Sequence, residues 1–412
     1  MRKPWTVLIS ISLAIFFGAS ISKNSWIFSV LEIGGNLFIQ ALTLVVVPLV
    51  MASIITGVAR IASESEFGKI GAKTFGYFVL INLIAILIGV AIGNLAHPGL
   101  SIQWSGTPIP PLPSQTNESL VNFFLDIIPS NILDAFAKGK MLGLIFFSIL
   151  FGYALTHTSK TSFEVHKRFW KGIFEAMIKI THAIMFFLPF GVFCLVAKVF
   201  AEMGLETLRP LVHLIWASIL ALSIFAFGAI PLILKLFGKI SIIPYFKAIS
   251  PALITAFSTS SSSATLPITL ECMEERAGIS NRICSLVIPL GTSINLAATA
   301  LYNTMGALFI AQVFRIPMPL TSQILLILVS LFVSFGVASV PGGGLIAVLT
   351  LLKTMGLPLE GLGLFLALDR LLDMFRTSAN VCSYTASVVL VAKSAGEETA
   401  LVKKKNKVQP RV

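Results

Sequence analysis

The sequence predicts an all-α polytopic membrane protein with eight transmembrane helices and two re-entrant helical hairpins. Its 412 residues are 56% hydrophobic and only 12% charged, with a mean hydropathy of +0.92, whereas a soluble domain carries about 25% charged residues. Two apolar segments in the second half are each interrupted by small or polar residues. The last long apolar segment contains four charged residues within 369–376. Composition therefore indicates the class of protein, and the interruptions indicate its architecture.

The excess of basic residues fits a membrane protein. A net charge of +12 would suggest nucleic acid as the partner of a soluble domain. Here the lysines and arginines gather in connecting segments and in the C-terminal tail, as the positive-inside rule predicts, so no nucleic-acid partner is expected. The four cysteines lie in apolar stretches without metal-ligand or paired spacing and are predicted to be free thiols.

The first half of the chain contains six predicted spans. Arg2 and Lys3 precede the first apolar run, which places the N-terminus in the cytoplasm. That run is long and lacks a clear small-residue cleavage site, so a membrane helix is favoured over a signal peptide. The basic stretch 160–171 is predicted to be a cytoplasmic turn between the fourth and fifth spans. In order, the segments are 1–62 with helices 1 and 2, 70–96 with helix 3, 118–203 with helices 4 and 5, and 207–238 with helix 6.

The second half departs from simple spans. Residues 245–272 place a serine-rich tip between two apolar arms, with charged segments at both ends. A serine run is usually a flexible linker, but a re-entrant hairpin fits these flanks, and its irregular tip is tolerated where protein or water supplies hydrogen bonds. Residues 322–355 repeat the pattern with a glycine-rich tip. The remaining segments are 277–312 with helix 7, 358–394 with helix 8, and 395–412 as a basic cytoplasmic tail.

This arrangement indicates transport. Two hairpins that enter from opposite membrane faces, each followed by a broken or polar helix, are typical of secondary transporters built from inverted repeats. An intramembrane enzyme could use a serine of the run 260–263 as its nucleophile, but no histidine lies near that run in the sequence. We therefore expect a transporter and not an enzyme.

A charged stripe marks the expected functional centre. On a helix, Asp369, Asp373, Arg376 and Asn380 fall at i, i+4, i+7 and i+11 and share one face, with Thr377 beside Asp373. A charged side chain at the centre of a bilayer costs roughly 2.5 to 3.5 kcal/mol on insertion scales. The stripe must therefore face protein, water or a ligand. A buried ion pair that only neutralises Asp373 and Arg376 is the structural alternative to a binding site.

Three ordered motifs, one in each irregular segment, resemble those of a known family: Ser260–Pro267, Val340–Gly344 followed by Gly356–Gly361, and Asp369–Val381. The chain resembles the glutamate/aspartate transporters, which are dicarboxylate/amino acid:cation symporters. The resemblance covers essentially the whole chain.

The resemblance implies a fold and a mechanism. The family is expected to form a homotrimer in the cell membrane, with both termini of each chain in the cytoplasm. Helices 1, 2, 4 and 5 would form a static scaffold. The other helices and the two hairpins would form a transport domain that slides as an elevator. The second hairpin would act as the outer gate, with Val340, Pro341 and Gly342 at its tip. No cofactor is implied beyond a co-transported cation.

The resemblance also assigns roles in the binding of an acidic amino acid. Asp373 would hold the ammonium group, and the two-pronged guanidinium of Arg376 would hold the side-chain carboxylate. Ser261 and Ser262 would take the main-chain carboxylate together with backbone N–H groups of the tips. Relatives for neutral amino acids lack this arginine, and relatives for C4-dicarboxylates lack this aspartate, which favours glutamate or aspartate. The site would be completed by Thr299, Thr377 and Asn380, with Asp369 and Asn295 in supporting positions.

The sequence departs from the family at the sodium ligands. In helix 7, Leu296 and Ala297 replace the methionine and aspartate of the motif Asn-Met-Asp-Gly-Thr. Tyr384 replaces an aspartate of helix 8, and Ile81 replaces a threonine of helix 3. Sodium is a hard cation that prefers oxygen ligands and negative charge. Two sodium sites are therefore predicted to be lost, and no metal ligand is assigned.

These losses favour proton coupling, with Asp373 or Asp369 as the carrier. Two alternatives remain at this point: a sodium-coupled symporter with a reduced ion set, and an exchanger of amino acids or dicarboxylates. A membrane receptor or sensor that uses the same binding site is the hypothesis from another class.

Overall fold

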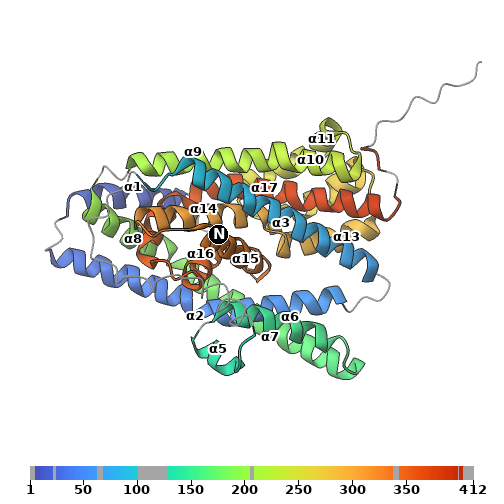
Figure 1. Cartoon of the computed structure of the whole chain (residues 1–412), viewed down its shortest axis with the longest axis horizontal. Coiled ribbons are helices and arrows are strands. Elements are labelled where there is room, and N and C mark those ends of the chain that lie inside the picture. Colours follow the sequence, from blue (N-terminus) through green and yellow to red (C-terminus); the bar gives the residue numbers. More distant parts are fainter. Residues whose placement is uncertain are drawn as a thin grey trace, which may run out of the picture.

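The computed structural model describes residues 5–21, 25–62, 68–100, 128–138, 140–204, 208–336, 343–397 and 399–401. All regular structure in these residues is helical (Figure 1). Within them, four helices are long and apolar enough to cross a membrane, and a bent helix pair makes up to five. Shorter apolar helices include both arms of the second predicted hairpin. The all-helical membrane architecture predicted from the sequence is confirmed.

The N-terminal half folds largely as predicted, with one correction. Its helices are α1 (Trp5–Ala19), α2 (Trp26–Ala62), α3 (Gly68–Ala96), α5 (Ile132–Lys138), α6 (Met141–Leu155), α7 (Lys160–Phe186) and α8 (Leu188–Met203). The prediction of a turn at 160–171 is wrong, because α7 begins at Lys160 and the basic residues lie on its first turns. Ser159 caps this helix by accepting a hydrogen bond from the backbone N–H of Ser162 at 3.3 Å. The first residues of the predicted fourth span, 118–127, lie outside the described part.

The C-terminal half contains the interrupted helices. It comprises α9 (Leu208–Ser223), η2 (Ile224–Ala229), α10 (Ile230–Ile233), η3 (Leu234–Gly238), α11 (Ile242–Thr259), α12 (Ser262–Glu271), η4 (Cys272–Arg276), α13 (Asn281–Ile294), α14 (Ala297–Val313), α15 (Leu320–Gly336), α16 (Gly343–Thr354), η5 (Leu359–Gly361) and α17 (Leu362–Ser394). The segments η2 and η3 are π-helical turns that continue α9 and α10 as one rod. Helices α11 and α12 form the first hairpin, and α15 and α16 are the arms of the second.

The serine-rich tip is a tight helix-to-helix turn. Ser260 ends α11 in the left-handed conformation, with φ of 50°. The hydroxyl of Ser261 then caps α12 by accepting from the backbone N–H of Ala264 at 3.2 Å. Ser and Asn side chains favour such caps because they satisfy helix-end donors. The serines therefore reverse the chain and do not act as a flexible linker.

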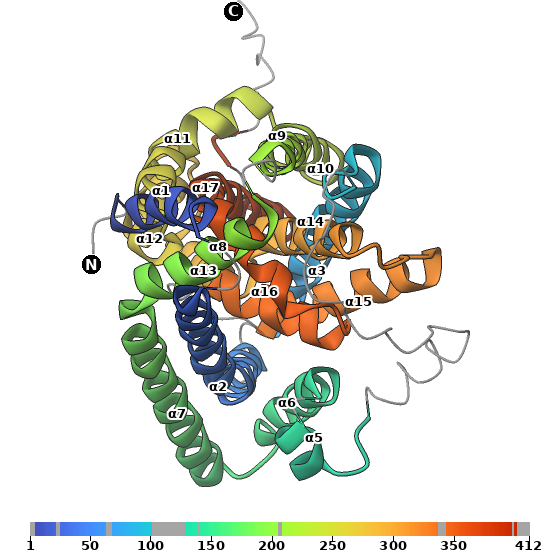
Figure 2. The ribbon, with the colours of Figure 1, turned by 90° about the vertical axis from the view of Figure 1, so that its left-hand side faces the viewer.

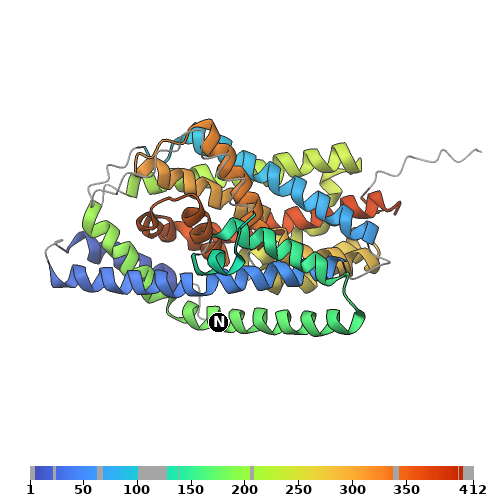
Figure 3. The same cartoon turned by 60° about the horizontal axis from the view of Figure 1, so that its bottom comes forward.

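Helix α17 lies at the centre of the molecule (Figure 2). It packs against α3, α9, α11, α13 and α14, and it meets α8 on another side. The helices α1, α2, α6, α7 and α8 pack mainly on one another (Figures 2 and 3). The charged stretch of the sequence thus lies on the helix with the most neighbours.

The chain folds back after α17 and ties several helix ends together. Ser280 precedes α13, and both its backbone N–H and its hydroxyl donate to the carboxylate of Glu397, at 3.2 and 2.5 Å. The backbone N–H of Ala400 donates to the carbonyl of Ala277 at 3.0 Å. Leu401 is buried. The predicted tail therefore begins with a strap that packs on the helices, residues 395–397 and 399–401, while its lysine-rich part lies outside the described residues.

We expect Glu397→Ala to lower the stability of the protein. The substitution removes a carboxylate from the positive end of the α13 dipole and leaves the donors of Ser280 without their acceptor. Losses of this kind cost about 1 kcal/mol. Thermal unfolding of the detergent-solubilised protein, followed by intrinsic fluorescence, should show a lower midpoint than for Glu275→Ala, which removes an exposed carboxylate nearby. Equal midpoints for the two variants would contradict the assigned role of Glu397.

Candidate functional site

The charged stripe of α17 forms a partly exposed cluster around the buried Arg376. This side chain is only 4% exposed, and it donates to Asp369 Oδ1 at 3.0 Å and to Asp373 Oδ1 at 2.6 Å. The ring of Tyr302, from α14, lies with its centroid 4.9 Å from the guanidinium carbon. Charge-assisted hydrogen bonds and an aromatic face are the partners that make a buried arginine tolerable. The predicted stripe is thus a real cluster, in which the pairing of Asp373 with Arg376 occurs.

Sequence reasoning missed one member of this cluster. Arg370 places its Nη1 atom 3.6 Å from Asp373 Oδ2, and its side chain is 28% exposed. The i, i+3 spacing of Arg370 and Asp373 on a helix was the signal that could have identified the pair. Asp373 therefore faces a different arginine with each of its two oxygens.

The second hairpin covers the buried arginine. Gly344 lies in the first turn of α16, and a Cβ atom built there would lie 2.9 Å from Arg376 Nη2. Any larger residue would have to displace the end of the Arg376 side chain or the helix, and glycine allows this close approach. The predicted gate residues Val340, Pro341 and Gly342 lie outside the described part of the chain. The described start of α16 nevertheless places this hairpin directly against the charged cluster.

Asn380 and Thr299 join α17 to the break between α13 and α14. Asn380 Oδ1 accepts from the backbone N–H groups of Ala298 and Thr299, at 2.9 and 3.4 Å. Its Nδ2 atom donates to the hydroxyl of Thr299 at 2.9 Å. The amide thus caps the N-terminal end of α14 from another helix. The structure brings these two predicted residues together one turn beyond Arg376.

The first hairpin reaches the same region of α17. Phe257 of α11 packs edge-on against Phe375, with ring centroids 5.0 Å apart. The hydroxyl of Ser261 accepts the capping hydrogen bond of α12, while Ser262 and Thr377 are buried. The structure therefore brings the hairpin beside the cluster, while the Ser261 hydroxyl serves the turn.

Asn295 belongs to a neutral polar chain. Its Oδ1 atom accepts from Asn82 Nδ2 at 2.8 Å, and its Nδ2 atom donates to Ser387 Oγ at 3.3 Å. Asn82 also donates to the carbonyl of Phe78 at 2.9 Å, and its Oδ1 atom is buried without a hydrogen-bond partner. These neutral side chains join α3, the break between α13 and α14, and α17.

The positions that differ from the family motifs are buried. The side chain of Tyr384 is fully buried, and its hydroxyl lies 3.5 Å from the hydroxyl of Thr269. A Cβ atom built at Gly291 would lie 2.5 Å from the Cβ atom of Tyr384. Ile81, Leu296 and Ala297 are also buried. Among the described residues, no group of three or more His, Cys, Asp or Glu side chains could hold a metal ion. Apolar and aromatic atoms thus occupy these positions.

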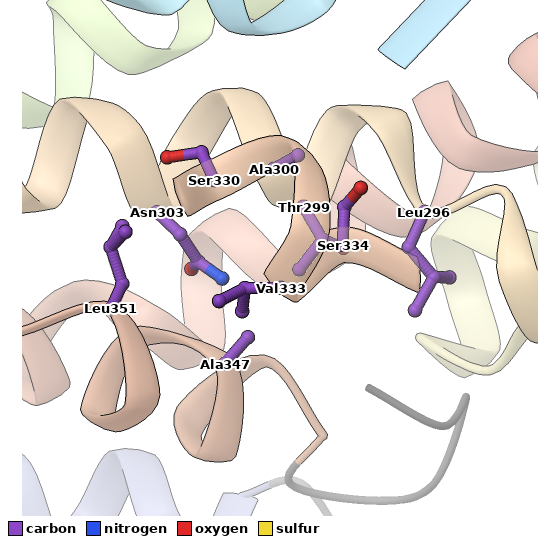
Figure 4. Close-up of a pocket in the computed structure, with 9 residues that line it drawn as sticks. All are labelled: Leu296, Thr299, Ala300, Asn303, Ser330, Val333, Ser334, Ala347 and Leu351. Atoms are coloured by element: carbon purple, nitrogen blue, oxygen red, sulfur yellow. The ribbon is translucent and has the colours of Figure 1, made fainter. Parts of the chain in front are cut away.

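A narrow cavity lies beside Thr299, between α14 and the second hairpin (Figure 4). The polar members of its wall are two hydroxyls of α15, one hydroxyl of α14 and one amide of α14. Asn303 is 3% exposed, and its Oδ1 atom has no hydrogen-bond partner. The lining residues are Leu296, Thr299, Ala300, Asn303, Ser330, Val333, Ser334, Ala347 and Leu351.

Comparison with known proteins assigns the chain to a family. The model of the sodium:dicarboxylate symporter family matches residues 4–394. The chain belongs to this family. Because the family consists of symporters, the predictions of a multi-pass membrane transporter and of a protein that is not an enzyme are confirmed.

Similar transport proteins are named for several substrates. A proton/sodium-glutamate symport protein of Geobacillus stearothermophilus is 37% identical over 407 residues, covering 96% of both chains. A proton/glutamate-aspartate symporter of Escherichia coli is 34% identical, over 94% of this chain and 92% of the relative. A C4-dicarboxylate transport protein of Bacillus subtilis is also 34% identical, over 88% of this chain and 87% of the relative.

We expect Tyr384→Ala to destabilise this symporter strongly. Removing a fully buried aromatic ring leaves a cavity between α13 and α17 and costs about 3–5 kcal/mol. Tyr384→Phe removes only a long hydrogen bond and should cost less than about 1 kcal/mol. Thermal unfolding midpoints should therefore follow the order wild type, Phe variant, Ala variant. The control is Tyr153→Ala, which truncates a tyrosine that is 56% exposed, and a loss there as large as at Tyr384 would refute the packing role.

Proposed function

We propose that this symporter is a secondary active transporter of the acidic amino acids glutamate and aspartate. The observation that carries the proposal is the ion pair between the partly exposed Asp373 and the buried Arg376 beneath the second hairpin. Charges held inside an apolar protein mark substrate or ion pathways. An acidic amino acid brings one ammonium and two carboxylates, and the pair offers one anion and one planar cation to receive them.

Three charged side chains of the cluster have a role in this proposal. Asp373 binds the ammonium group, and Arg376 binds the side-chain carboxylate in place of one of its present aspartate partners. Asp369 then keeps Arg376 oriented, since it holds Nη1 while Asp373 holds Nη2. The main-chain carboxylate is bound by Ser261, Ser262 and the backbone donors of the hairpin tips.

The presence of Asp373 favours amino acids over simple dicarboxylates. A relative named for glutamate and aspartate and a relative named for C4-dicarboxylates are both 34% identical to this chain. Overall similarity therefore does not choose between these two classes of substrate. A C4-dicarboxylate has no ammonium group to compensate Asp373, and its second carboxylate would be repelled by that side chain. Transport of C4-dicarboxylates is therefore the second candidate and the weaker one.

The coupling cation is proposed to be a proton. The neutral chain of Asn82, Asn295 and Ser387 and the buried ring of Tyr384 supply no carboxylate for sodium. Asp373 and Asp369 remain as acidic groups that can carry a proton between the two sides. A sodium site built on neutral oxygens, or exchange without net coupling, would leave the same substrate site in use.

In the proposed mechanism, one group of helices moves relative to another. Helices α1, α2, α6, α7 and α8 form a scaffold, which assembles with two other copies into a trimer. The remaining helices form the transport domain, which slides as an elevator while the second hairpin opens and closes the site to the outside. Both chain termini lie in the cytoplasm. The packing of the helices into two groups supports this division.

Arg376→Cys should abolish recognition of the side-chain carboxylate. Uptake of labelled L-aspartate into proteoliposomes should fall by more than about 100-fold, because a bidentate charged contact is lost, and uptake of small neutral amino acids such as L-serine should rise. The variant also leaves Asp369 without a cation and Asp373 with Arg370 alone, so its folding is checked by size-exclusion chromatography and thermal unfolding. Arg376→Lys keeps the charge and serves as the control. Unchanged affinity for aspartate in a folded Cys variant would refute the assignment.

The coupling proposal predicts uptake without sodium. Proteoliposomes in sodium-free buffer should accumulate labelled L-glutamate when the outside is made acidic by about one pH unit, and collapse of the gradient with a protonophore should stop accumulation. A strict requirement for sodium would overturn proton coupling. Counterflow without accumulation would indicate exchange. Binding without any uptake or exchange would favour a receptor.

A further inference from the structure

Arg370 is the charged residue of the α17 cluster to which the proposed function gives no role. Its guanidinium lies 3.6 Å from Asp373 Oδ2, while Arg376 holds Oδ1 of the same carboxylate at 2.6 Å. The two contacts differ in burial, because the Arg370 side chain is 28% exposed and that of Arg376 only 4%. Asp373 thus has one tight, buried cation and one looser, more accessible cation.

We propose that Arg370 is a specificity-determining residue that occupies the ammonium position at Asp373 when the site holds no substrate. This inference rests on the proposed function, because it takes Asp373 as the group that binds the ammonium. An incoming amino acid would displace Arg370 from Oδ2, and its ammonium group would take the place of the guanidinium. Arg370 therefore competes with the ammonium group of the substrate for one oxygen atom.

The choice of Arg370 as the displaced partner follows from geometry. Arg376 is fixed by two aspartates, by the ring of Tyr302 and by the close approach of Gly344. A separation of 3.6 Å is long for a charge-assisted hydrogen bond, which lies at about 2.7–2.9 Å. Arginine that is partly exposed also regains hydration when it leaves its partner. The accessible oxygen of Asp373 is thus the one that Arg370 faces.

Charge balance connects this competition to selectivity. Asp369, Arg370, Asp373 and Arg376 sum to zero charge. Without Arg370 the cluster carries one negative charge, which favours a ligand with an ammonium group over a dicarboxylate without one. Arg370 therefore reduces the difference between the affinity for acidic amino acids and the affinity for C4-dicarboxylates. A substrate without an ammonium group leaves Arg370 on Asp373 and keeps the compensating charge.

The test compares the binding of L-aspartate and succinate to purified protein by isothermal titration calorimetry, in sodium chloride and in choline chloride at pH 6. The two ligands have the same carbon chain and both carboxylates, and only aspartate has the ammonium group. Arg370→Gln should increase the preference for aspartate over succinate by roughly 3- to 10-fold, which is the change in affinity expected when a partly exposed ion pair is lost. Arg370→Lys should stay near the wild-type preference.

Two controls separate competition from a structural role. Arg315→Gln makes the same change at an exposed arginine that donates to the carbonyl of Leu100, and it should leave the preference unchanged. In the Asp373→Asn background, Arg370→Gln should have no further effect, because the contested carboxylate is gone. If Arg370 only positioned Asp373, its removal would weaken both ligands or mainly aspartate.

The outcomes distinguish the inference from the function on which it rests. Binding of aspartate by the wild type with an unchanged or reduced preference in Arg370→Gln overturns the role of Arg370 and leaves the proposed function intact. A folded wild type that binds L-aspartate, L-glutamate and succinate in neither salt refutes the proposed function, and the inference with it.

Discussion

The removal of the α17 charges from water is the constraint on which this structure depends. A charge in an apolar interior is stable only when it is paired and hydrogen-bonded. Arg376 meets this condition through two aspartates and an aromatic face. The surrounding helices must therefore hold Tyr302 and the glycine-rich start of α16 at fixed distances from one guanidinium. The same arrangement leaves only 4% of the Arg376 side chain exposed, while the side chains of Asp369 and Asp373 are each 24% exposed.

Helix ends inside the protein pose the second demand, because their backbone N–H and C=O groups have no partner within the helix. In two described breaks, a polar side chain supplies the partner. Asn380 caps α14 from α17, and Ser261 caps α12 from the hairpin tip. Breaks of this kind bring polar groups to membrane depth. The fold thereby provides donors and acceptors near the charged cluster without exposing them to lipid.

The sequence predicted most of the architecture because the relevant signals are local. The hairpins follow from apolar arms around a polar tip, and the stripe follows from helical spacing. The departures at Tyr384 and Ala297 were also visible, although only the structure shows that a ring packed against Gly291 fills the first position. Contacts between distant residues were not predictable in this way. The partner of Asn82 and the strap at Glu397 depend on how helices far apart in the chain pack together.

The length of α7 shows the limit of composition as a guide. Basic residues usually mark connections between spans, yet here Lys160 begins a helix of 27 residues, where ion pairs between charges three or four residues apart support the exposed face. Charge alone therefore does not locate a turn. Within α17, by contrast, the spacing of the charges was decisive, because four of them fall within two turns of one helix.

The zero net charge of the α17 cluster has an electrical consequence. Moving one elementary charge through a membrane potential of 100 mV changes its free energy by about 2.3 kcal/mol. In the proposed elevator movement, a body that carries two ionised arginines and two ionised aspartates side by side would gain no such energy from these groups, because their contributions cancel. Voltage dependence of that movement would then come from the substrate and its coupling ion, or from charges elsewhere on the body, and not from this cluster.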